Sequence, residues 1–118
     1  YNKMHLYAEE WRYIDAGTTP VTVDTPFGKL GLLICADMYG SRGPVPTYIK
    51  NNVDLYIVPT SWASGSGIRY FASLARWVNK TVLISNHTYL PDAAIIDGDG
   101  SAQSYLNSRS GVAYGYIK

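Results

Sequence analysis

The feature that most constrains the fold is an apolar run that ends abruptly at the only cysteine of the chain. The large aliphatic residues 32–34 lead directly into Cys35, and small or polar residues dominate positions 36–44. A short apolar run bounded by turn-forming residues is typical of a buried strand. Strand ends in α/β proteins often hold reactive groups, because the rigid strand fixes a side chain that the loop exposes. Residues 31–37 therefore predict a strand that ends in a tight turn carrying a thiol.

Two further apolar runs and an amphipathic segment extend this pattern. Residues 54–59 and 81–85 are predicted as buried strands, the first of them stopped by Pro59. Between them, residues 68–80 carry apolar side chains at three- and four-residue steps, which is typical of one helix face. The order strand, helix, strand, helix, strand favours an α/β layered fold with a mixed sheet over an all-β sandwich.

The remaining predicted elements are short. They are a strand end at 1–5, a helical turn around Glu10, a hairpin of strands 19–24 and 29–35 joined by a turn at 25–28, a helix at 46–52, and strands at 93–96, 101–106 and 111–117.

Composition narrows the class of protein. The chain has 118 residues, of which 47% are hydrophobic and 16% charged, and its formal net charge is +1. It is long enough for one domain with a real core. It has no basic run to attract nucleic acid or a membrane surface, and no apolar stretch near the roughly 20 residues of a membrane span. We therefore expect one domain over residues 1–118, with neither nucleic acid nor membrane as a partner.

The cysteine content bears on compartment and on metal binding. A single cysteine excludes an internal disulfide framework and fits a reducing compartment, so we expect a cytoplasmic protein. No Cys/His spacing typical of a zinc site is present, so no metal site is expected.

Cys35 alone is most simply a packing residue, because free cysteines are among the most buried residue types. A thiol nucleophile needs a cation or base nearby, and neither His5 nor His87 lies in a protease-like Cys–His context. Lys3 offers a cation for the thiolate and for an oxyanion, and a glutamate could move the proton that a leaving amine requires. Glu9 and Glu10 are both candidates for that glutamate. This set is the inventory of a cysteine amidase without histidine.

Several segments resemble the nitrilase superfamily of carbon–nitrogen hydrolases. Residues 1–6 resemble its Lys-x-His-Leu-like segment, and residues 25–37 resemble its Gly-x-x-Ile-Cys-x-Asp elbow. The resemblance continues downstream at 54–62, 75–82, 85–86 and 104–111. It therefore covers essentially the whole chain.

The resemblance implies a fold and a set of roles. The fold would be part of a four-layer α-β-β-α sandwich. Cys35 would be the nucleophile that forms a thioester with the acyl part of a small amide, and Lys3 would stabilise the oxyanion. The Ala36 N–H would be the second oxyanion donor, and Trp62 would line the substrate pocket. Glu10 would match the second glutamate of the family, and we prefer it to Glu9 on spacing from the lysine. The resemblance implies no cofactor, and it implies a homodimer or higher homo-oligomer.

The general-base glutamate of the family lies well before the lysine, and this chain starts just ahead of Lys3. We therefore expect residues 1–118 to be an N-terminally incomplete domain that is inactive by itself. The missing part would lie on a longer chain or on a second chain.

Alternatives follow from the same residues. Ala36 and Asp37 after the nucleophile favour amide over nitrile hydrolysis, since nitrile hydrolysers usually carry Trp-Glu there. An amine could replace water as the acyl acceptor. A different class of function is a non-catalytic or truncated nitrilase-like binding module. A redox-sensing thiol at Cys35 is the third interpretation.

Overall fold

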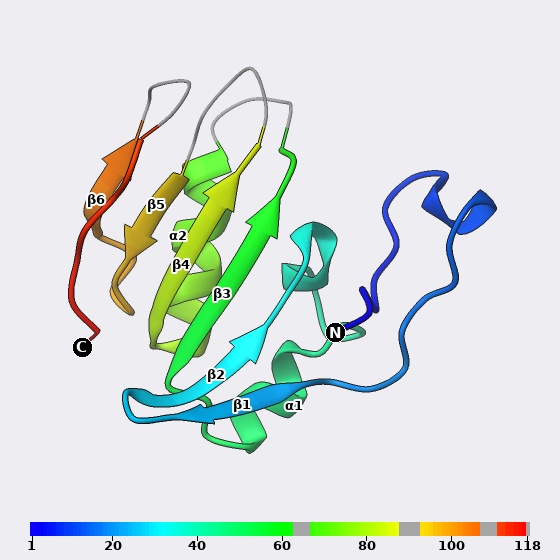
Figure 1. The fold of residues 1–118 in the computed structure, drawn as a ribbon, viewed down its shortest axis with the longest axis horizontal. Coiled ribbons are helices and arrows are strands. Elements are labelled where there is room, and N and C mark those ends of the chain that lie inside the picture. Colours follow the sequence, from blue (N-terminus) through cyan, green and yellow to red (C-terminus); the bar gives the residue numbers. More distant parts are fainter. Residues whose placement is uncertain (63–66, 88–92, 107–110, 118) are drawn as a thin grey trace.

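The computed structural model describes residues 1–62, 67–87, 93–106 and 111–117. The elements in these ranges are, in chain order, η1 (Glu10–Arg12), β1 (Thr22–Thr25), β2 (Gly28–Leu32), η2 (Cys35–Met38), α1 (Val45–Lys50), β3 (Leu55–Thr60), α2 (Gly67–Val78), β4 (Thr81–Asn86), β5 (Ala93–Ile96) and β6 (Ala102–Leu106). The described strands form one six-stranded sheet in the order β1-β2-β3-β4-β5-β6, with α2 against its far face in Figure 1.

The sheet is mixed, as the sequence predicts. Strands β2, β3 and β4 run parallel in the middle, while β1, β5 and β6 pair antiparallel at the edges. The register places Leu32 beside Ile57, and Val58 beside Ile84. The carboxyl ends of the three parallel strands therefore meet at one edge of the sheet, which is where α/β proteins usually place a site.

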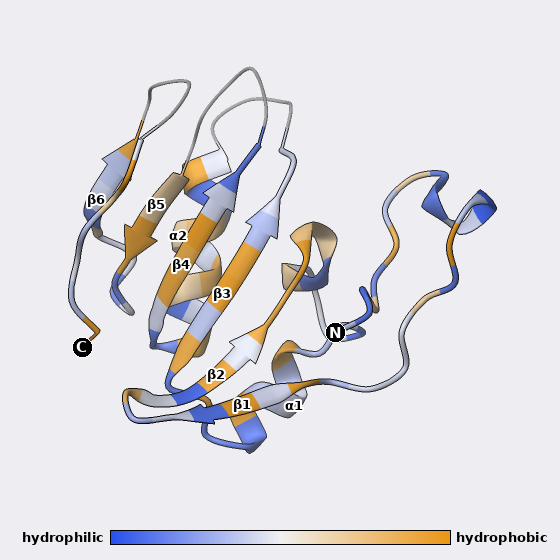
Figure 2. Cartoon of the chain, viewed as in Figure 1, coloured by the Kyte–Doolittle hydropathy of each residue, from blue (hydrophilic) through white to orange (hydrophobic). Residues whose placement is uncertain are grey.

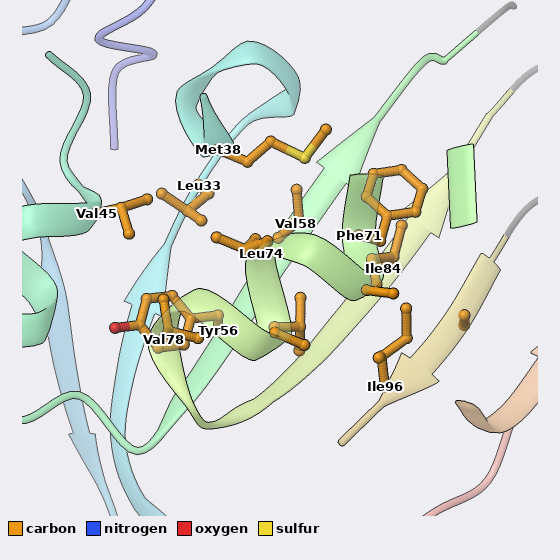
Figure 3. Close-up of a cluster of buried hydrophobic side chains, with 14 of the residues drawn as sticks. Leu33, Met38, Val45, Tyr56, Val58, Phe71, Leu74, Val78, Ile84 and Ile96 are labelled. Carbon is orange, nitrogen blue, oxygen red and sulfur yellow. The ribbon is translucent and has the colours of Figure 1, made fainter. Parts of the chain in front are cut away.

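One face of the sheet packs against both helices. Tyr56 and Val58 of β3 form a buried cluster with Phe71 and Leu74 of α2 and with Val45 of α1 (Figure 3). Both helices contribute to this cluster, so they cover the same face. Each large side chain buried here contributes about 1.5–3 kcal/mol to folding. The hydrophobic colouring along β3 and β4 in Figure 2 follows this cluster.

The helix predicted at 68–80 is confirmed, with its end slightly earlier. Phe71, Leu74, Ala75 and Val78 are buried on one stripe of α2. The helix ends because Asn79 takes a left-handed conformation with φ of 52°, the geometry with which many helices terminate.

Three predicted details are wrong. Residues 1–5 do not form a strand. Pro59 does not stop β3 but lies inside it, opposite Ser85 of β4. The Ile57 carbonyl accepts from Leu33 on the β2 side, and Pro59, two residues on, faces that same side, where β2 has already ended at Leu32. No β2 residue lies opposite Pro59 on that side, so its missing N–H removes no hydrogen bond between β2 and β3.

The third error concerns residues 111–117, which contain no strand. Their contact with β6 runs through the Gln103 side chain, which donates to the Tyr116 carbonyl (2.7 Å) and accepts from the Tyr116 N–H (2.7 Å). The Gln103 side-chain amide thus takes the place of the strand-to-strand hydrogen bonds that the alternating sequence predicted. Part of the 104–111 segment, residues 107–110, lies outside the described residues. No helix in the described part of the chain is long and apolar enough to cross a membrane.

Candidate active site

The elbow forms where β2 ends. The strand stops at Leu32, and Cys35 opens the 3-10 turn η2 with a left-handed φ of 47°. A non-glycine residue in that region is strained by about 1–3 kcal/mol, so the surrounding contacts must hold it there. Cys35 is half-buried, and Ala36 after it is buried. The predicted turn with a thiol is confirmed, although the strand ends sooner than expected.

Lys3 and Glu10 form the charged part of the site. The Lys3 ammonium donates to both carboxylate oxygens of Glu10, at 2.8 and 2.6 Å, and only 8% of the lysine side chain is exposed. Glu10 also accepts from the Tyr7 N–H at 2.6 Å. The bond from Lys3, reinforced by that N–H, holds the pKa of Glu10 below its ordinary value. Glu9 instead pairs with Arg12 on the surface, at 3.3 Å, so the two glutamates have different partners.

Asp37 joins two parts of the chain. One is the lysine segment, residues 1–21, and the other is the elbow, the turn at residues 33–38 that carries Cys35. Its Oδ1 accepts from the backbone N–H groups of Met4 (2.9 Å) and His5 (2.6 Å), which follow Lys3 directly. Its Oδ2 accepts from the Ile34 N–H (2.9 Å), just before Cys35. The Asp37 side chain therefore lies between the residues that flank Lys3 and Cys35. The sequence marked Asp37 as part of a motif and as an indicator of amide chemistry, but not as a link to the segment that holds Lys3. The signal for such a link was a carboxylate placed directly after a buried strand.

Trp62 follows the end of β3 and packs into an aromatic cluster. Its ring centroid lies 5.7 Å from that of Tyr39 and 5.0 Å from that of Tyr70. Its backbone N–H donates to the Asn86 side chain at the end of β4 (2.8 Å). Burial, followed by the charges of Tyr70 and Cys35, raises the pKa of Tyr39 to about 12. Trp62 thus packs against Tyr39, a residue of the loop after the elbow that the sequence did not single out.

The surroundings of Cys35 suit some ligands and reactions better than others. A groove lined by Tyr39, Tyr70 and Trp77 lies between the residues after the elbow and α2, and neither Cys35 nor Trp62 is among its lining residues. Within the described ranges, no group of three His, Cys, Asp or Glu side chains could hold a metal ion. The arrangement offers a thiol at a strained turn, a buried ammonium and N–H donors, which suits chemistry at a carbonyl carbon.

No protein-family model matches the chain. Two curated proteins are similar to it. Pantetheine hydrolase VNN2 of Homo sapiens is 29% identical over 91 residues, which cover 73% of this chain and 17% of that protein. A probable nitrilase of Schizosaccharomyces pombe is 34% identical over 62 residues, covering 52% of this chain and 22% of that protein. The chain therefore spans only a small part of the curated relatives that it matches.

A solved structure decides the fold. An amidase from Nesterenkonia sp. AN1, of the nitrilase superfamily, superposes with a TM-score of 0.84 and 22% identity over 97% of this chain and 49% of the amidase. The chain has the nitrilase-superfamily fold. With the two curated relatives, this superposition confirms the resemblance drawn from the sequence and the predicted α/β class. The mixed sheet and its helices match about half of the amidase chain.

Proposed function

We propose that this chain carries the nucleophile and the lysine of a hydrolase that cleaves a non-peptide C–N bond of a small amide. One observation carries the proposal. The buried Lys3, paired with Glu10, sits in a segment that Asp37 bonds to the turn holding Cys35. A cation held next to a strained thiol turn is what thiolate attack on a carbonyl requires.

The reaction would proceed through a thioester. The Cys35 sulfur attacks the amide carbon, and the Lys3 ammonium and the Ala36 N–H stabilise the oxyanion. The N–H groups in the first turn of a helix lack intrahelical acceptors, so the one at Ala36 suits this role. The C–N bond then breaks, and the amine leaves with a proton. Water attacks the thioester, releasing the acid and regenerating the thiol.

Proton transfer would depend on a residue outside these 118. A general-base glutamate would take the thiol proton, deliver it to the leaving amine and activate the water. Glu10 would orient Lys3, and Trp62 would form part of the pocket wall. The amidase from Nesterenkonia sp. AN1 supports the nucleophile, because its active-site cysteine carries a covalent acetamide moiety derived from fluoroacetamide.

The sheet face opposite the helices is only half-buried, which supports an incomplete domain. Ile57, Leu83 and Ile95 alternate with the buried residues of β3, β4 and β5, and they are only half-buried. A second sheet of the four-layer sandwich, from the rest of the protein, would cover them. As the resemblance implies, that protein would be a homodimer or a higher homo-oligomer.

The test uses the natural protein, meaning the longest natural reading frame that contains these 118 residues. It is assayed for amine or ammonia release from a panel of small amides, and Cys35→Ala should lower turnover at least about 10³-fold. The control is Ser73→Ala on the exposed side of α2, which should retain turnover. Fluoroacetamide should add to Cys35, and the adduct is detected by mass spectrometry. Retention of turnover by Cys35→Ala would overturn the proposal.

A second candidate is the binding module, favoured by the same half-buried apolar sheet face. It predicts a folded natural protein with no amide turnover and no fluoroacetamide adduct. The same assays with an added amine separate hydrolysis from acyl transfer, since transfer yields a new amide. Oxidation of Cys35 without turnover would indicate the redox thiol instead.

A further inference from the structure

The two oxygens of the Asp37 carboxylate contact different parts of the site. Oδ1 receives the N–H groups of Met4 and His5, at 2.9 and 2.6 Å. Oδ2 receives the Ile34 N–H at 2.9 Å and the Tyr1 hydroxyl at 2.7 Å. One side chain therefore binds backbone groups immediately after Lys3 and immediately before Cys35.

Burial shows that this contact is built into the fold. Asp37 is fully buried, with an exposed fraction of 0%. A buried carboxylate is costly unless hydrogen-bond donors surround it, and bonds to an ionised acceptor are about twice as strong as neutral ones. The donors that meet this need come from the lysine segment as well as from the elbow. Exchanging the carboxylate for another acceptor would therefore loosen one segment from the other.

The lysine segment has few other attachments of this kind. Apart from η1, residues 1–21 carry no helix or strand. The Lys3 carbonyl accepts from the Gly17 N–H at 2.7 Å, but this bond lies within the same segment. Lysine is a flexible side chain, so its ammonium is placed by its backbone and by Glu10. A displacement of about 1 Å at a reacting group can lower a rate about 10²-fold.

We propose that Asp37 is a positioning residue that sets the place of the Lys3 ammonium relative to the Cys35 thiol. The inference rests on the proposed function and deepens it. Asp37 touches neither substrate nor reacting atoms in this account. It acts through Lys3, and its effect on the rate must therefore depend on the presence of Lys3.

A double-mutant cycle in the natural protein tests this dependence. Asp37→Asn keeps the size of the side chain but replaces one acceptor oxygen with a donor. We expect kcat for the best amide of the panel to fall about 10²-fold, with KM changed less than about 3-fold. In a Lys3→Met background, Asp37→Asn should lower kcat by no more than about 2-fold further. Asp15→Asn, an exposed aspartate of the same segment, is the matched control and should leave both constants unchanged.

The outcomes separate this inference from the proposed function. If Cys35→Ala is inactive but the effects of Asp37→Asn and Lys3→Met multiply, Asp37 supports the fold generally and the positioning role is wrong. If Cys35→Ala retains turnover, the proposed function itself fails.

Should Asp37→Asn not fold, Tyr1→Phe replaces it, because this variant removes one donor and leaves the carboxylate in place. Its expected loss in kcat is about 3-fold, and the loss should vanish in the Lys3→Met background. An equal loss in both backgrounds would overturn the positioning role.

Discussion

The sheet with its helices and the segment of residues 1–21 are held by different forces. The sheet is held by a contiguous apolar cluster in which Val58, Phe71 and other side chains are fully buried. In residues 1–21 no apolar side chain is fully buried, and several large ones are exposed, including Tyr7 at 64% and Tyr13 at 82%. That segment is attached by polar contacts, chiefly to Asp37. The buried apolar cluster thus lies in the sheet and its helices, whereas Lys3 and Glu10 of the proposed site lie in the segment.

This difference indicates two levels of cooperativity. Regions with few buried apolar contacts open locally at a lower free energy than the core. The segment should therefore open while the sheet stays folded, and catalysis should be lost before the fold. The predictions below test this separation.

The largest expected effect follows from breaking the core. Phe71→Ala removes a fully buried ring and should lower the free energy of unfolding by about 3–5 kcal/mol, because the cavity fills only partly. Urea denaturation of the natural protein measures the loss. Arg69→Ala, at an exposed position of the same helix, is the control and should change stability by less than about 0.5 kcal/mol. If Phe71→Ala lowered the free energy of unfolding by less than about 1 kcal/mol, the ring would not be part of a tightly packed core.

A smaller effect is expected where the two regions meet. The buried Tyr48 hydroxyl accepts from the Val21 N–H (3.0 Å) and donates to the Leu32 carbonyl (2.7 Å). Tyr48→Phe leaves both backbone groups without that partner and should cost about 1–3 kcal/mol. Hydrogen exchange at Val21 should accelerate more than exchange at Val58. Equal acceleration at both would show that the segment and the sheet unfold as one unit.

Acid should loosen the structure within the segment selectively, because both hydrogen-bond partners of the Glu10 side chain, Lys3 and the Tyr7 N–H, belong to it. The pKa of Glu10 in the folded protein is below its ordinary value of 4.5, so its contribution is present above pH 4.5 and is lost as pH falls through the lower, folded value. Hydrogen exchange in residues 1–17 should therefore rise, relative to β3, between about pH 5 and pH 3. Glu10→Gln should remove this pH dependence, whereas Glu9→Gln should keep it. A pH response that persists in Glu10→Gln would assign it to another group.

The smallest effect is expected at a surface ion pair beside the sheet. Lys80 lies 3.2 Å from Asp54, and both side chains are partly exposed. Lys80→Met should change the free energy of unfolding by less than about 1 kcal/mol, because water and salt screen such pairs. Denaturation at low and high salt measures this. A loss as large as that of Phe71→Ala would break the contrast between apolar and polar contacts.

Much of the fold could be predicted from short-range patterns. The apolar stripe along α2 and the apolar runs of β3 and β4 predict which residues are buried, because a helix or strand places residues on faces at a fixed period. Pro59 was misjudged, since the cost of a proline depends on which neighbouring strand it faces and where that strand ends. Residues 111–117 were misjudged because alternation alone does not show whether a partner strand is available.

The site divides in the same way. The sequence by itself determined the thiol after an apolar strand and offered Lys3, Glu9 and Glu10 as charged candidates, and the resemblance selected Glu10 and added Ala36 and Trp62. Only the tertiary structure decided that Lys3 pairs with Glu10 and not Glu9 and that Trp62 packs on Tyr39. It alone brought the lysine segment to the elbow through Asp37. The physical reason is range: periodicity acts over a few residues, whereas these hydrogen bonds join residues about thirty positions apart.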